Sequence, residues 1–149
     1  MKIEEAIKQK KPFRNEHHKA LANIIHTYGW LMECLKKELK PFDITIQQYN
    51  VLRILKGAGE PISTSEIRQR LLDKMSDSSR MVERLCKKGW INKQACCHDK
   101  RLVDVSLSEE GLKMLDSMQI CEGRFDQIMK NLTSEDAALL NNLLEKIRE

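Results

Sequence analysis

The sequence predicts a mainly α-helical protein with a single β-hairpin. Apolar residues recur at every third or fourth position through most of the chain, as on one face of an amphipathic helix. Residues that commonly cap helices precede several of these segments. The period changes near residues 102–107, where apolar and polar residues alternate as in a half-buried strand.

Two helices are expected before residue 45. Ile3 and Ile7 lie four positions apart, which favours a short helix that ends before Pro12, because proline disfavours helix in the residue before it. A long amphipathic helix is expected from about Asn15 to Lys40. Its apolar positions are Leu21, Ile24, Ile25, Tyr28, Leu31, Met32, Leu35 and Leu39.

Three shorter helices are expected next, over about residues 45–59, 63–72 and 76–88. The first two begin with capping boxes, in which side chains satisfy the exposed N–H groups of the first turn. The capping pairs are Thr45 with Gln48 and Ser63 with Glu66. Ser76 is expected to cap the third helix.

A hairpin and two further helices complete the predicted order. Strands are expected at residues 90–95 and 102–107, joined by a polar turn. Ser108 should cap a long fifth helix and Thr133 a sixth. The apolar positions of these two helices are Met114, Met118, Cys121, Phe125 and Ile128, then Leu140, Leu143, Leu144 and Ile147.

This order predicts one domain, residues 1–149, built around a winged helix-turn-helix. The helix-turn-helix and the two-stranded β-hairpin that follows it form a lobe at residues 45–108. Helical segments 1–44 and 109–149 flank it. The 149 residues suffice for a single core.

Composition favours a cytoplasmic protein. No apolar stretch approaches the roughly 18–20 residues that span a bilayer, and the N-terminus lacks the apolar run of a signal peptide. Five scattered cysteines argue against a disulfide framework.

Positive charge is concentrated in one part of the chain. From Ser63 to Val105 there are ten Lys and Arg against six Asp and Glu, which accounts for the whole net charge of +4. A basic stretch on an otherwise neutral chain suggests a polyanionic partner such as a nucleic acid.

The helix expected at residues 76–88 has two contrasting faces. Met81, Val82, Leu85 and Cys86 cluster on one side, and Ser76, Arg80, Arg84 and Lys87 lie on the other. A short helix with a polar, cationic face fits the DNA major groove, although a solvated helix face has the same pattern. The first residues, Ser76 to Ser79, are small and polar, and their hydroxyl and N–H groups can bind phosphate.

The predicted hairpin tip carries His98-Asp99-Lys100-Arg101. A wing beside a DNA-binding helix can reach the adjacent minor groove, whose negative potential attracts arginine. Asp99 could pair with the Arg101 guanidinium and orient it. An ordinary charged turn is the alternative.

Three segments together resemble the MarR family of bacterial regulators. They are Gly89-Trp90-Ile91-Asn92-Lys93, Asp99-Lys100-Arg101, and Val105-Ser106-Leu107-Ser108-Glu109-Glu110-Gly111. In that family a glycine and an apolar pair follow the recognition helix, an aspartate–basic–arginine triplet marks the wing tip, and Leu-Thr-x-x-Gly opens the next helix. Ser108 here replaces the commoner threonine and Lys93 the commoner arginine.

The resemblance implies a homodimer held by helices in segments 1–44 and 109–149, with a near-palindromic double-stranded DNA operator as its partner. Recognition helices would lie in major grooves and wing arginines in flanking minor grooves. Repression is implied, since a dimer on a promoter blocks polymerase. The DNA-binding residues expected are Ser76, Ser78, Ser79, Arg80, Arg84, Lys87, Lys93, Asp99, Lys100 and Arg101.

Other interpretations stay open at this point. Cys96 and Cys97 could sense redox state if nearby lysines lower a thiol pKa, and a winged helix could instead bind another protein. His26, Tyr28 and Trp30 could line an effector pocket, as in proteins of the resembling family, or simply pack. Cys34, Cys86 and Cys121 are expected in the core. No phosphate loop, metal-binding helix or nucleophile elbow is present, so we expect no enzyme, cofactor or metal.

Overall fold

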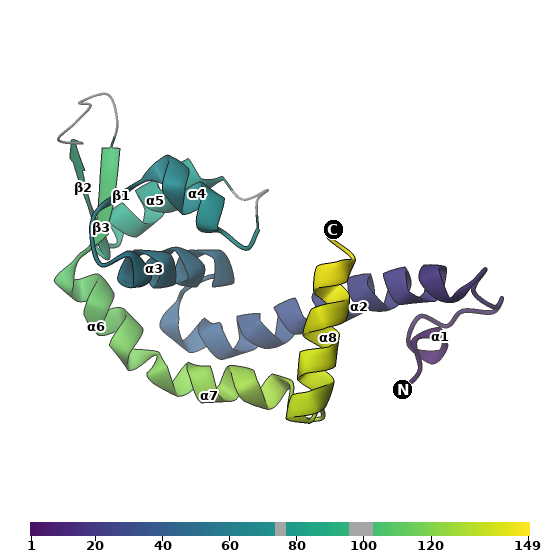
Figure 1. Ribbon diagram of the computed structural model, residues 1–149. Helices are drawn as coiled ribbons and strands as arrows, with labels where there is room; N and C mark the ends of the chain where they lie inside the picture. The colour runs from purple at the N-terminus through teal and green to yellow at the C-terminus, as the bar shows by residue number, and fades with distance from the viewer. Residues whose placement is uncertain (74–76, 96–102) are drawn as a thin grey trace.

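The computed structural model describes residues 1–73, 77–95 and 103–149 (Figure 1). Its helices and strands lie close to the predicted segments. They are α1 (Ile3–Ala6), α2 (Glu16–Leu39), the 3₁₀ helix η1 (Lys40–Phe42), α3 (Ile46–Ala58), β1 (Ile62–Ser63), α4 (Thr64–Arg70), α5 (Ser78–Lys87), β2 (Ile91–Ala95), β3 (Val103–Leu107), α6 (Glu109–Ser117), α7 (Gln119–Ile128) and α8 (Ser134–Lys146).

The predicted caps are confirmed for four helices. The Thr45 hydroxyl accepts a hydrogen bond from the Gln48 N–H at 3.1 Å, and the Gln48 side chain accepts from the Thr45 N–H at 3.1 Å. Ser63, Ser108 and Thr133 likewise accept from the N–H three residues on. At Ser63 only this half of the predicted capping box is present, and the Glu66 carboxylate pairs with Arg70 instead. Capping depends only on neighbouring residues, which is why the sequence predicts these helix starts.

The cap of α5 differs from the prediction. Asp77 occupies the N-cap, and its carboxylate accepts from the Arg80 N–H at 3.2 Å, so placing the cap at Ser76 was wrong by one residue. Both residue types cap well, but a carboxylate also interacts favourably with the positive end of the helix dipole.

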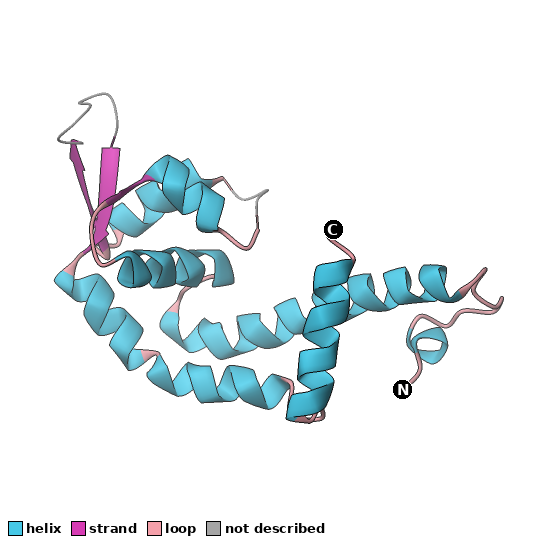
Figure 2. Cartoon of the chain, viewed as in Figure 1, coloured by secondary structure: helices cyan, strands magenta, loops and turns pink. Residues whose placement is uncertain are grey.

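The sheet contains one more strand than the predicted hairpin. β1 pairs antiparallel with β3, with Ile62 opposite Val105, so the strand order is β1-β3-β2 (Figure 2). The predicted hairpin of β2 and β3 is present. A two-residue strand is too short to show an alternating pattern, so only its pairing partner identifies it.

The long helix predicted after Ser108 is two helices, α6 and α7, that meet at Met118. The Met118 N–H donates to the Leu115 carbonyl and the Cys121 N–H to the Met118 carbonyl, which tightens the chain there. Met118 and Cys121 are buried. No proline or glycine occurs at the junction, so tertiary packing rather than a helix-breaking residue accounts for the interruption.

The core is centred on the lobe formed by α3, α4, α5 and the sheet, and Leu39, Leu115 and Met118 extend it to α2 and α6. Its fully buried side chains include Leu52, Ile67, Leu85, Ile91 and Val105. α2 and α7 are in contact and extend away from this lobe, and α8 projects from the end of α7 (Figure 1). No residue of α8 is buried. We call α2, α7 and α8 the arm. Many of its apolar side chains, among them Ile24, Leu140 and Leu143, are exposed and available to another surface.

Ser108 and Gly111 join the start of α6 to the end of α5. The Ser108 hydroxyl donates to the Gly89 carbonyl at 2.6 Å and accepts from the Gly111 N–H at 3.0 Å, and its own N–H donates to the Trp90 carbonyl at 3.1 Å. A Cβ on Gly111 would overlap the Trp90 carbonyl. This close backbone approach requires glycine.

Replacing Gly111 with alanine should lower the free energy of unfolding by about 1–3 kcal/mol, because the added methyl group must displace backbone. Gly123→Ala is the matched control, since that glycine is also helical and its added Cβ meets no atom within 4 Å. The control should be neutral or more stable by up to about 1 kcal/mol. Thermal unfolding followed by circular dichroism measures both. Equal stability of the two variants would contradict the close approach.

Candidate nucleic-acid interface

Helix α5 is held at both ends by local hydrogen bonds. Asp77 caps its start, and Gly89, with a left-handed φ of 74°, follows its end. There the Gly89 N–H donates to the Cys86 carbonyl and the Trp90 N–H to the Leu85 carbonyl, which is a Schellman motif. Both ends of α5 are thus fixed, and its C-terminal end leads directly into the first wing strand.

The two faces predicted for α5 are present. Met81, Val82 and Leu85 are buried in the core, and the opposite face is exposed. The exposed residues are Ser79, Arg80, Glu83, Arg84 and Lys87. The structure therefore brings together four of the predicted site residues on one open helix face.

Ser78 does not share that face. It is only 7% exposed and lies on the buried side of the first turn. The prediction that Ser78 contacts DNA rests on its small polar side chain at the helix start, and residue type alone does not specify on which side of the helix that side chain lies.

The exposed face of α5 is cationic, and its charges are only partly neutralised. Arg80 pairs with Asp77 at 3.2 Å, and the Arg80 side chain is 79% exposed. Arg84 and Lys87 have no ion pair with any other residue in the described part of the chain. Lys93 on β2 is also exposed. Such side chains can approach a polyanion without first breaking strong internal contacts.

Helix α4 adds two cations that the sequence analysis did not assign to the site. Arg68 and Arg70 lie exposed in its last turn, and Arg70 pairs with Glu66. α4 packs against α5 as the first helix of the helix-turn-helix, the helix that crosses the DNA backbone in such motifs. The excess of basic residues from Ser63 onward was the available signal.

Lys88, which follows α5, has an internal partner. Its ammonium donates to the Asp43 carbonyl, lies 3.1 Å from the Asp43 carboxylate and sits 4.5 Å from the centre of the Trp90 ring. A cation over an aromatic face is stabilised by the ring quadrupole. This contact ties the end of α5 to the turn before α3.

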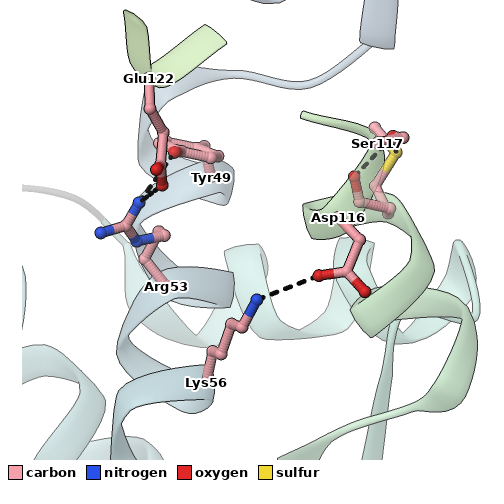
Figure 3. Close-up of polar contacts among 7 residues, drawn as sticks. Tyr49, Arg53, Lys56, Asp116, Ser117 and Glu122 are labelled. Atoms are coloured by element: carbon pink, nitrogen blue, oxygen red, sulfur yellow. Dashed lines mark hydrogen bonds and ion pairs between the residues drawn. The ribbon is translucent and has the colours of Figure 1, made fainter. Parts of the chain in front are cut away.

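Polar contacts attach the lobe to α6 and α7 (Figure 3). Arg53 donates to the Tyr49 hydroxyl at 3.2 Å and pairs with Glu122, and Lys56 lies 3.1 Å from the Asp116 carboxylate. The bond to Tyr49 and the nearby Glu122 carboxylate raise the pKa of Arg53. These pairs link α3 of the lobe to α6 and α7.

Some predicted positions lie outside the described residues. These are Ser76, Asp99, Lys100 and Arg101 of the DNA-binding set, together with Cys96, Cys97 and His98. Cys121 is buried, as expected, and burial raises the pKa of its thiol, whereas Cys34 and Cys86 are only half-buried. Within the described part of the chain, no cluster of side chains suits a metal ion and no helix could cross a membrane.

The predicted pocket residues on α2 do not come together. Tyr28 lines a cavity of about 300 Å³ with Met32 and Leu35, but His26 and Trp30 do not. All three predicted residues are exposed.

The MarR family model matches residues 44–103, which include α3, α4, α5 and β2. The multiple antibiotic resistance protein MarR of Salmonella typhimurium is 35% identical over 115 residues, covering 76% of this chain and 79% of that protein. The transcriptional repressor IacR of Pseudomonas putida is 28% identical, covering 83% and 74%.

A solved structure shows the same similarity in three dimensions. The crystal structure of a MarR variant from Escherichia coli in complex with operator DNA is 31% identical, covers 86% of this chain and 93% of that chain, and superposes with a TM-score of 0.78. Sequence identity, fold and the exposed cationic face of α5 agree, and the chain belongs to the MarR family of winged helix-turn-helix transcription regulators.

Proposed function

We propose that this protein is a homodimeric transcription repressor that binds a near-palindromic operator in double-stranded DNA. The observation that carries the proposal is the exposed face of α5, where Arg80, Arg84 and Lys87 lie opposite a buried apolar side. The similarity to an operator-bound MarR structure supports it.

In this proposal each recognition helix α5 enters a major groove, where base edges present distinct donors and acceptors. Arg80 and Arg84 are the side chains long enough to reach base edges, while Ser76, Ser79 and Lys87 suit phosphate contacts. At the wing, Lys93 and Lys100 approach the backbone and Arg101, oriented by Asp99, enters the minor groove. Ser78 is left out of this set because it is buried.

Dimerisation is supported by the apolar surface of the arm. Ile24, Ile25 and Tyr28 on α2 are exposed. Leu140, Leu143 and Ile147 are exposed on α8, which has no buried residue. A 13-residue helix is marginal in water unless an apolar face is packed. A second copy, related by a two-fold axis, supplies that packing for both protomers.

Repression follows from placing such a dimer over a promoter, where it excludes polymerase. The related IacR is named as a repressor. The activity of the proposed repressor is binding and release of DNA rather than catalysis.

Arg84→Ala should weaken operator binding roughly 5- to 150-fold, corresponding to about 1–3 kcal/mol, and change base preference at particular positions. Selection from a random DNA pool, followed by fluorescence anisotropy on the selected site, measures both effects. The wild-type pool should converge on a near-palindrome. Lys113→Ala on α6 is the control, since it removes an exposed cation away from α5. Failure of wild-type protein to enrich any sequence would sink the operator proposal.

Arg101→Ala should weaken binding to operator and to random DNA alike, because the minor groove offers mainly shape and charge. The salt dependence should become shallower by about one unit of slope. Asp99→Asn should cost less, since the arginine keeps its charge. Titrations at several salt concentrations test this, and an Arg101→Ala protein with wild-type affinity would contradict the wing assignment.

Leu143→Glu should convert the dimer to a monomer, because a charged side chain cannot be buried unpaired in an apolar interface. Light scattering at micromolar concentration measures the mass. Leu112→Glu is the control: Leu112 is similarly exposed, at 41% against 52% for Leu143, but lies on α6 near the lobe. A monomeric wild-type protein, or equal behaviour of the two variants, would argue against this interface.

A further inference from the structure

Glu83 is an acidic residue in the middle of the cationic face of α5. A helix turns by about 100° per residue, so residues three or four positions apart lie in one row along its surface. Arg80, Glu83 and Lys87 form such a row, and all three are exposed. The row lies opposite the buried apolar side of the helix. The Glu83 carboxylate therefore belongs to the surface that the recognition helix offers to DNA.

Neither cation in this row neutralises Glu83. The Arg80 guanidinium is held one turn earlier, where its Nε lies 3.2 Å from one carboxylate oxygen of Asp77. The other Asp77 oxygen accepts from the Arg80 backbone N–H, which fixes that carboxylate as the helix cap. Glu83 and Lys87 form no ion pair with each other or with any other residue that the structure describes. The helix thus presents an unpaired carboxylate between two cations.

An unpaired carboxylate at this place opposes general attachment to DNA. Affinity for DNA of any sequence comes mainly from cations that neutralise phosphates, and a carboxylate repels phosphates. The exposed face of α5, together with its cap, has three cations and two carboxylates, an excess of one positive charge. These residues are Arg80, Arg84 and Lys87, against Asp77 and Glu83. Tight binding by this helix therefore needs contacts that only particular base pairs offer.

Cytosine is the base that suits a carboxylate in the major groove. An ionised carboxylate accepts hydrogen bonds and cannot donate them. Guanine and thymine present acceptors in that groove, and adenine presents its N7 acceptor beside its amino group. Cytosine presents only the N4 amino group, which donates. A glutamate on a recognition helix therefore favours cytosine over the other three bases.

We propose that Glu83 is a specificity-determining residue that accepts a hydrogen bond from the N4 amino group of a cytosine in each operator half-site. At other sequences the same carboxylate meets acceptors and phosphates and opposes binding. Specificity is a difference between two affinities, so the contact and the repulsion act in the same direction. This inference rests on the proposed function, because it assigns a base to one residue of the recognition helix.

The test compares the wild-type protein with Glu83→Ala and Glu83→Gln, each over residues 1–149. Selection from a random DNA pool gives the preferred site of each protein. Fluorescence anisotropy then gives dissociation constants for the wild-type site, for sites in which one cytosine of each half-site is replaced by thymine, and for a random duplex. Glu109→Gln on α6 is the matched control, since it removes an exposed carboxylate that is not on α5. Because Glu83 is exposed, its variants should keep the wild-type melting temperature.

Replacing one particular cytosine by thymine should raise the dissociation constant of the wild type about 5- to 150-fold. In Glu83→Ala the same replacement should change it by less than about twofold, because the acceptor is gone. This variant should also bind the random duplex several-fold more tightly, because a like charge has left the DNA-facing surface. Selection with Glu83→Gln should raise the share of adenine at that position, since glutamine pairs with adenine N6 and N7. Glu109→Gln should match the wild type throughout.

Undiminished discrimination against thymine in Glu83→Ala at every cytosine would overturn the base contact, and so would a preferred site for Glu83→Gln identical to that of the wild type. Random-duplex affinity of Glu83→Ala no tighter than that of the wild type, or an equal change in Glu109→Gln, would overturn the repulsion. In each of these cases the wild type still selects a near-palindromic site, so the proposed function stands. A wild type that selects no site overturns the proposed function, and this inference with it.

Discussion

The contact between Ser108 and the Gly89–Trp90 backbone connects three parts of the molecule that bear on DNA binding. The end of the recognition helix, the first wing strand and the start of α6 meet there within a few hydrogen bonds. Because Gly111 lacks a side chain, α6 can begin directly against the Trp90 carbonyl. The direction of α5 is therefore coupled to that of α6. The same contacts fix the position from which β2, the first wing strand, begins.

Two ion pairs connect the lobe to α6 and α7. Arg53 and Lys56 of α3 pair with Glu122 of α7 and Asp116 of α6, on either side of the junction at Met118 (Figure 3). Each pair is largely exposed and contributes little to stability by itself. Because the two pairs lie at the junction between helices, together they favour one orientation of α6 and α7 relative to α3. In a dimer, that orientation would set the separation of the two recognition helices.

The distribution of apolar residues divides the molecule into a well-packed core and an arm that leaves much of its apolar surface exposed. The lobe buries its apolar residues among α3, α4, α5 and the sheet, with Leu39, Leu115 and Met118 from the neighbouring helices completing the same core. The arm leaves α8 with no buried residue and much of the apolar face of α2 exposed. Large exposed apolar surfaces on a small protein commonly mark interaction sites. Folding of the arm and assembly of the proposed dimer would then be a single process.

The sequence by itself determined the features that depend on neighbouring residues: the helix starts at Thr45, Ser63, Ser108 and Thr133, the β2–β3 hairpin, and the two faces of α5. Local hydrogen bonds and side-chain periodicity are sufficient for these. Most described positions of the predicted DNA-binding set accordingly lie exposed where expected. Only the tertiary structure decided the rest: the pairing of β1, the interruption between α6 and α7 at Met118, the burial of Ser78 and the ion pair of Lys88 with Asp43. Each depends on packing or contacts with atoms distant in the sequence, which local pattern does not specify.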